Sequence, residues 1–113
     1  GERVVGEVRD ATPFIVDDLT SSGGTLARSA RALVEAGADP PLVAVAHGVF
    51  NAEARAKLAD APIERLLVTD SIDPPRLTAD DLSVLERVSC AELIAEAVRR
   101  VVSGGSISAL LGD

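Results

Sequence analysis

The residues best suited to chemistry lie together between Phe14 and Leu26. Two adjacent carboxylates, Asp17 and Asp18, follow a short apolar run. The residues after them are hydroxyl-bearing or glycine: Ser21, Ser22, Gly23, Gly24 and Thr25. Backbone N–H groups and hydroxyls at the start of a helix bind anions, and the helix dipole favours negative charge there. Glycines allow the close backbone approach and the positive φ that such a turn needs. The pattern predicts a phosphate-binding loop.

The two carboxylates indicate which groups, besides a phosphate, a ligand of this loop would have. Asp17 and Asp18 would repel a phosphate unless they contact something else, so we expect them to face hydroxyl groups or a divalent cation. A sugar phosphate fits, because its phosphate can bind the glycine turn and its vicinal hydroxyls the carboxylates. The alternative is that Asp17, Asp18 and Ser22 only cap a helix. The preceding strand, the paired acids and the following helix together favour the phosphate site over simple capping. The loop is not a Walker A loop, because a Walker A loop has a lysine after its glycines and this one does not.

The elements that position this loop alternate along the chain. Short apolar runs rich in β-branched residues predict strands at 13–16, 42–46, 65–69 and 84–88. Segments of helical period separate the first three strands, and a Pro- and Asp-rich stretch at 70–81 predicts a surface loop before the fourth. Such alternation is typical of an α/β fold with a parallel sheet and helices across its faces. The loop at 13–26, His47 and Asp70 would then share the crevice at the carboxyl ends of the strands.

Helices are expected at 25–36, at 51–58 with Asn51 as N-cap, and after 89. Ser89 and Glu92 have the spacing of a capping box for the last helix, and Gly104-Gly105 would end it. We expect that helix to bury the apolar residues of one face: Leu93, Ile94, Ala97, Val98, Val101 and Val102.

Composition limits the class of protein. A chain of 113 residues, 47% hydrophobic and 26% charged, has room for one folded domain. The 18 acidic residues outnumber 11 basic ones and give a net charge of −7, which disfavours a nucleic-acid partner. The lack of a long apolar run predicts no membrane partner and a cytoplasmic protein. Cys90 is the single cysteine, which excludes an intrachain disulfide and a thiolate zinc site and fits a reducing compartment.

The loop resembles the ribose-5-phosphate or PRPP loop of type I phosphoribosyltransferases and ribose-phosphate pyrophosphokinases (PRPP synthetases), usually written Asp-Asp-x-x-Asp-Thr-Gly-Gly-Thr. The rest of the chain is similar to the second family. Residues 45–50 (Val-Ala-His-Gly-Val-Phe) resemble its Thr-His-Gly-Val-Phe stretch, residues 62–72 its next strand and loop, and residues 84–111 its last helix and Ser-Val-Ser tail. The resemblance covers nearly the whole chain. It implies a partial C-terminal domain, 1–113, with a Rossmann-like, type I phosphoribosyltransferase-like parallel sheet.

That family transfers diphosphate from magnesium-ATP to ribose 5-phosphate and makes PRPP. By resemblance, Asp17 and Asp18 hold the ribose hydroxyls, residues 21–25 wrap the 5-phosphate, and Mg²⁺ comes with ATP. Ser21 stands where the commonest pattern has Asp. The family's ATP-binding segments, metal-binding His and basic catalytic loop lie upstream of this part. We therefore assign no catalytic residue and no protein-held metal, and we expect a homo-oligomer or an assembly with the N-terminal part.

Alternatives remain for the function and for several residues. The chain could belong to a noncatalytic regulatory protein associated with the synthetase, or to a salvage phosphoribosyltransferase, which the C-terminal third disfavours. The tail Ser106-Ile107-Ser108 is either a loose terminus or, by resemblance, part of a regulatory nucleotide or phosphate site at a subunit interface. His47 is either structural or faces the crevice, and Asp70 either meets ligand or caps a loop. Cys90 is expected as a small core residue, and Arg99-Arg100 as a solvated helix end.

Overall fold

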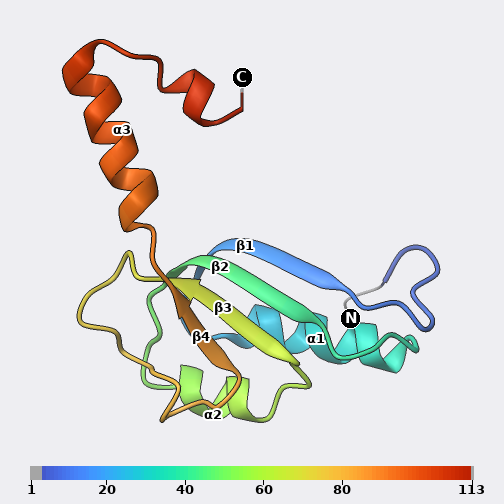
Figure 1. Ribbon diagram of the computed structural model, residues 1–113. Coiled ribbons are helices and arrows are strands. Elements are labelled where there is room, and N and C mark those ends of the chain that lie inside the picture. Colours follow the sequence, from blue (N-terminus) through green and yellow to red (C-terminus); the bar gives the residue numbers. More distant parts are fainter. Residues whose placement is uncertain (1–3, 113) are drawn as a thin grey trace.

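The computed structural model describes residues 4–112, so both ends of the expected 1–113 domain lie outside the described residues. Four parallel strands form one sheet in the order β1 (Phe14–Thr20), β2 (Leu42–Gly48), β3 (Arg65–Thr69) and β4 (Leu85–Val88) (Figure 1). The helices are α1 (Gly24–Glu35), α2 (Ala54–Ala59), α3 (Ala91–Ser103) and a 3-10 turn, η1 (Ser108–Leu110). The α/β class and the parallel sheet are confirmed.

The core lies between the sheet and helices α1 and α2. Alternate residues of β2 and β3, such as Val43 and Leu66, point toward the helices and are fully buried. Leu26 of α1 and Leu58 of α2 meet them there, and Phe50 closes the core near the end of β2. Only Phe50 of the two aromatic residues is buried, so aliphatic side chains form most of this core.

Two element boundaries differ from the sequence prediction. β1 does not stop at Asp17-Asp18 but continues to Thr20, because its end pairs with the end of β2 as far as Gly48. Asn51 does not cap α2, which begins at Ala54 after the N-cap Glu53. The Asn51 side-chain oxygen instead accepts a hydrogen bond from the Glu53 N–H at 3.0 Å and closes the turn before the helix.

The expectation of helices across both faces of the sheet is wrong for residues 4–112. Helices α1 and α2 both lie on one side, whereas α3 extends past the carboxyl edge of the sheet (Figure 1). The second face is left open, and Phe14 and Val16 of β1 are 57% and 72% exposed there. A parallel sheet normally has both faces covered, so this surface is unusual for the fold.

The start and the packing of α3 also differ from expectation. The N-cap is Cys90, whose own side chain makes no capping hydrogen bond. Ser89 is therefore not the N-cap of the expected capping box, although its Oγ accepts from the Ala91 N–H at 3.2 Å. No residue of α3 is buried, because the helix stands away from the sheet. The expected buried face of α3 is therefore exposed. Gly104 does end the helix, with a φ of 72°.

Candidate phosphate-binding site

The loop between β1 and α1 surrounds a hollow of about 200 Å³. Its lining contains every residue predicted for the phosphate: Ser21, Ser22, Gly23, Gly24 and Thr25. Asp17 lines the same hollow from β1. Helix α1 has no acidic residue in its first turn, so the positive end of its dipole is not offset from within the helix. The lining thus combines hydroxyls, a helix start and one carboxylate.

Gly23 gives the turn its shape. Its φ is 73°, in the left-handed region that side chains disfavour, and its carbonyl accepts the first helical hydrogen bond from the Ala27 N–H at 2.9 Å. A Cβ at this position would lie 2.6 Å from Cγ of Leu58, which is buried in α2. The turn is therefore in tight contact with α2 and needs glycine for both reasons.

Backbone hydrogen bonds from the residues that follow β2 also fix the loop. The Val49 N–H donates to the Thr20 carbonyl at 3.0 Å, and the Asn51 N–H donates to the Ser21 carbonyl at 2.9 Å. Within the loop, the Gly24 N–H donates to Ser22 Oγ at 3.3 Å. These bonds fix the backbone before any ligand binds, which lowers the entropic cost of binding.

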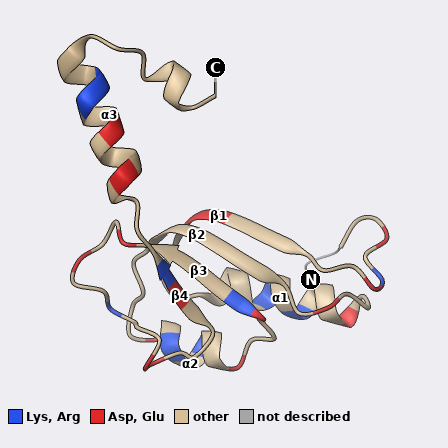
Figure 2. Cartoon of the chain, in the orientation of Figure 1, with Lys and Arg blue, Asp and Glu red and all other residues tan. Residues whose placement is uncertain are grey.

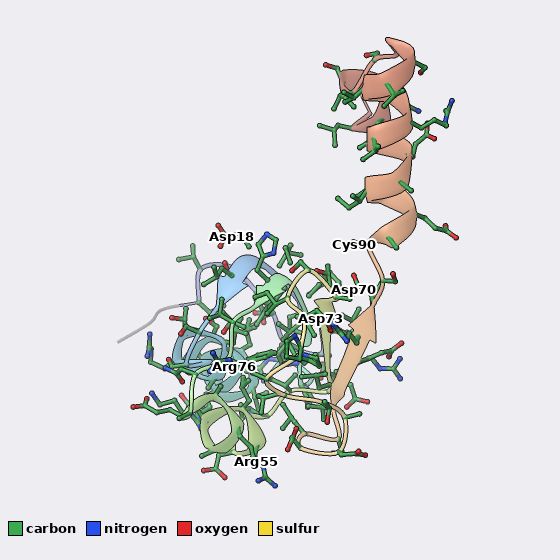
Figure 3. All side chains as sticks on the ribbon, turned by 90° about the vertical axis from the view of Figure 1, so that its left-hand side faces the viewer. Asp18, Arg55, Asp70, Asp73, Arg76 and Cys90 are labelled. Carbon is green, nitrogen blue, oxygen red and sulfur yellow. The ribbon has the colours of Figure 1, made fainter. Side chains whose placement is uncertain are left out.

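The two adjacent carboxylates are placed differently. Neighbouring residues of a strand point to opposite faces, and Asp17 is half-buried whereas Asp18 is exposed. Asp17 Oδ1 accepts a hydrogen bond from the Asp18 N–H at 2.9 Å. Asp17 thus lines the hollow, and Asp18 lies outside that lining at the same edge of the sheet (Figure 3).

His47 has a partner that sequence reasoning missed. Its Nδ1 lies 2.8 Å from Ser71 Oγ, and that hydroxyl donates to the Ala46 carbonyl at 3.3 Å. The bond joins two side chains 24 residues apart. His47 lies near the end of β2, and Ser71 comes just after the adjacent parallel strand β3. The register of these two strands was the signal that could have found the pair.

Asp70 anchors the start of α3. Its Oδ1 accepts hydrogen bonds from the Cys90 N–H at 2.9 Å and from the Cys90 thiol at 3.0 Å, and Figure 3 shows the two residues side by side. The backbone bond, then the thiol and then Ser89 lower the pKa of Asp70 to about 2. The same carboxylate, and secondly burial, raise the pKa of the Cys90 thiol. Cys90 is thus half-buried at a polar contact, and the expectation of a core residue is wrong.

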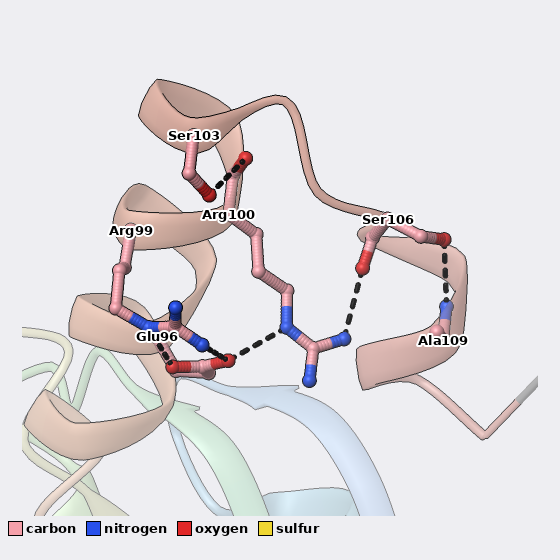
Figure 4. Close-up of polar contacts among 6 residues, drawn as sticks. All are labelled: Glu96, Arg99, Arg100, Ser103, Ser106 and Ala109. Atoms are coloured by element: carbon pink, nitrogen blue, oxygen red, sulfur yellow. Dashed lines mark hydrogen bonds and ion pairs between the residues drawn. The ribbon is translucent and has the colours of Figure 1, made fainter.

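The C-terminal tail is tied to α3 (Figure 4). Arg100 donates to the Ser106 carbonyl at 2.8 Å, and Ser106 Oγ accepts from the Ala109 N–H at 3.1 Å. Arg99 and Arg100 both pair with Glu96, and these bonds, from Arg99 first, lower the pKa of Glu96 to about 2. The arginines are paired within the helix, not merely solvated. The regulatory site expected at 106–108 stays a prediction.

Within residues 4–112, no three His, Cys, Asp or Glu side chains gather closely enough to hold a metal ion. Asp17 alone offers a carboxylate to the hollow. This donor set does not fit a Mg²⁺ ion held by the described residues.

Fold and loop together define an α/β protein with a hollow lined by glycines and hydroxyls at the carboxyl edge of a parallel sheet. Residues 2–112 match the family model described as phosphoribosyl synthetase-associated domain, and the chain belongs to this family. The part of the chain that the structure describes contains no helix long and apolar enough to cross a membrane.

Similar proteins are ribose-phosphate pyrophosphokinases. That of Maricaulis maris is 38% identical over 108 residues, and that of Neisseria meningitidis serogroup A is 36% identical over 110. The matches cover 95% and 97% of this chain but 34% and 33% of those proteins. The crystal structure of phosphoribosylpyrophosphate synthetase from Mycobacterium smegmatis superposes with a TM-score of 0.81 at 34% identity, covering 91% of this chain and 34% of that one. The chain thus spans about a third of its relatives' length.

Proposed function

We propose that this chain supplies the ribose 5-phosphate site of a ribose-phosphate pyrophosphokinase. The observation that supports this proposal is the hollow of about 200 Å³ at the start of α1, which Asp17 and residues 21–25 line together. The phosphate would accept hydrogen bonds from loop N–H groups and from the hydroxyls of Ser21, Ser22 and Thr25. The ribose hydroxyls would donate to the Asp17 carboxylate and, at the edge of the hollow, to Asp18.

The reaction proposed for the complete enzyme is transfer of diphosphate from magnesium-ATP to the anomeric hydroxyl of ribose 5-phosphate. Magnesium bound to ATP would neutralise charge on the transferred group. The residues of this chain bind the sugar phosphate and orient its anomeric hydroxyl, which makes the transfer effectively intramolecular. The hydroxyl of Ser21 replaces the carboxylate that the commonest form of the loop carries, so the phosphate meets one negative charge fewer here.

The arginines of α3 and of strands β3 and β4 are already paired with carboxylates, so they form no cluster that could bind the phosphates of ATP. Arg99 and Arg100 pair with Glu96, Arg65 with Glu86, and Arg87 with Asp73. Figure 2 shows these charges spread over α3 and the strands without a common focus. We therefore propose that the chain alone binds sugar phosphate and that catalysis needs the other part of the enzyme, as a homo-oligomer or with the N-terminal part. A cytoplasmic location fits the reduced Cys90 thiol and an ATP-dependent reaction.

The binding proposal can be tested on the chain itself by amide NMR. Millimolar ribose 5-phosphate should shift the amide resonances of residues 21–25, and inorganic phosphate should shift the same set more weakly. Unchanged spectra at millimolar sugar phosphate would contradict the assignment.

The substitution Asp17→Asn distinguishes binding of the sugar from binding of the phosphate group. A lost bond to a charged acceptor should weaken ribose 5-phosphate binding roughly tenfold or more and leave inorganic phosphate binding unchanged or slightly tighter. Asp80→Asn is the matched control, because Asp80 is exposed and outside the lining of the hollow. Equal effects of the two substitutions on sugar phosphate binding would contradict a role for Asp17.

The reaction itself is tested by PRPP formation from magnesium-ATP and ribose 5-phosphate. We expect product when the chain is joined to the remaining two-thirds of a relative, and none from the chain alone. Sugar phosphate binding without product in the joined protein would favour the noncatalytic, regulatory alternative. Pyrophosphate exchange with a nucleobase would favour a salvage phosphoribosyltransferase.

A further inference from the structure

Arg28 lies beside the candidate phosphate-binding loop without lining its hollow. It belongs to α1, three residues after Thr25. Side chains of an α-helix point back toward its N-terminus, so residues three apart can touch. Arg28 Nη2 donates to Thr25 Oγ1 at 3.3 Å, and a Cβ added at Gly24 would lie 3.4 Å from Arg28 Nη1. The guanidinium therefore lies over the first turn of α1, against two residues that do line the hollow.

The bond from Arg28 limits what the Thr25 hydroxyl can do. A hydroxyl has one proton to donate and two lone pairs that accept. Because Thr25 Oγ1 already accepts from Arg28, its proton is directed toward a different partner. Ser22 in the same lining is in the same state, since its Oγ accepts from the Gly24 N–H at 3.3 Å. A phosphate dianion presents only acceptors, so both hydroxyls are oriented to donate to it.

The charge of Arg28 is unfavourable for the helix by itself. The start of a helix carries the positive end of its dipole, where carboxylates stabilise the helix and cations do not. Helix α1 nevertheless has no acidic residue in its first turn and has the Arg28 guanidinium there. Positive charge thus gathers at the start of α1 in a chain whose net charge is −7. An anion in the hollow would offset this charge.

We propose that Arg28 is a positioning residue of the phosphate-binding site, which orients the Thr25 hydroxyl as a donor and adds a positive charge that favours a phosphate dianion. The inference rests on the proposed function for the identity of the ligand, ribose 5-phosphate, but inorganic phosphate can probe the same hollow. An Arg28 that made only an ordinary contact along the helix surface would stabilise α1 slightly and would contribute nothing to phosphate affinity.

Titration of the 113-residue chain with inorganic phosphate and with ribose 5-phosphate, followed by amide NMR, tests the proposal. Arg28→Met keeps the long apolar stem but removes the donor and the charge, so it should weaken binding of both ligands roughly three- to tenfold. Arg28→Lys restores a charged donor and should recover most of that loss. Arg31→Met is the matched control, because Arg31 lies three residues further along α1, donates to the Asp60 carbonyl and does not line the hollow. It should leave both affinities unchanged.

A double-mutant cycle shows whether Arg28 acts through the Thr25 hydroxyl. Thr25→Val removes that hydroxyl at nearly the same volume, so Arg28→Met should weaken phosphate binding less in this background than in the wild-type chain. Both side chains are exposed, and circular dichroism checks that each variant stays folded. Arg28→Leu repeats the test should Arg28→Met lose its spectrum. Unchanged phosphate affinity in Arg28→Met, or an equal loss with and without the Thr25 hydroxyl, overturns the inference.

The two ligands separate this inference from the proposed function. Binding of inorganic phosphate that depends on Arg28, with no preference for ribose 5-phosphate, would support the role of Arg28 and contradict the proposed function. Binding of ribose 5-phosphate that depends on Asp17 but not on Arg28 would do the reverse. Failure of the wild-type chain to bind either ligand at millimolar concentration overturns both.

Discussion

Gly23→Ala should destabilise the chain strongly. The left-handed conformation at φ 73° costs a side chain about 1–2 kcal/mol. The new Cβ would also lie 2.6 Å from Leu58 Cγ and 2.8 Å from Leu58 Cδ2. Leu58 is only 1% exposed and cannot move into solvent, so overpacking adds about 1–3 kcal/mol. The total of roughly 2–5 kcal/mol is a large part of the ~5–15 kcal/mol that holds a typical domain together.

Urea unfolding followed by circular dichroism measures this loss as a fall of about 1 M or more in the midpoint. Gly24→Ala is the matched control, one residue along the same loop. A Cβ there meets only Arg28 Nη1 and Ser22 Oγ, both at 3.4 Å, and the residue is already helical. Its stability should stay equal or rise by up to ~1 kcal/mol, because alanine favours helix. If both variants unfold at the same urea concentration, the account of the turn is refuted.

Three further predictions concern α3. The pKa of Asp70 is lowered from 3.8 to about 2, so the bonds by which its carboxylate anchors α3 are complete above pH 4 and are lost as the pH falls toward 2. The Cys90 amide resonance should titrate with a midpoint near 2, and Asp70→Asn should remove that titration. The raised pKa of the Cys90 thiol predicts slower alkylation by iodoacetamide at pH 8 than for a free cysteine, and no acceleration in Asp70→Asn would contradict the cause given. Arg100→Ala should free the tail, seen as faster proteolysis after residue 103, whereas Arg99→Ala should not, since only Arg100 reaches the Ser106 carbonyl.

Much of the sheet could be predicted because its signals are local. β3 begins and ends where the expected strand 65–69 does, and α1 begins and ends within one residue of the expected helix 25–36. The loop 21–25 was found from residue types at fixed spacing before a helix, and the structure gathers all five residues around one hollow. Whether ribose 5-phosphate binds there stays a prediction.

The sequence predictions that were wrong concern places where distant parts of the chain come into contact. Asp70 accepts a hydrogen bond from the Cys90 N–H at the start of α3 from 20 residues away, and no local pattern encodes that bond. The apolar period of α3 correctly indicated a helix with one apolar face. It could not indicate what covers that face, and within residues 4–112 nothing does. Asp17 and Asp18 were treated as a pair, but strand alternation separates them because β1 continues through both.

The order of the strands has a consequence for how the chain acquires its structure. Each strand pairs with its neighbour in sequence, so the sheet can grow one strand at a time as the ribosome releases the chain. Helices α1 and α2 are released between the strands they cover, and the core can close once β4 has joined the edge. Helix α3 follows β4, and within residues 4–112 its apolar side stays unmatched. The sheet can thus fold before any contact that the apolar side of α3 makes.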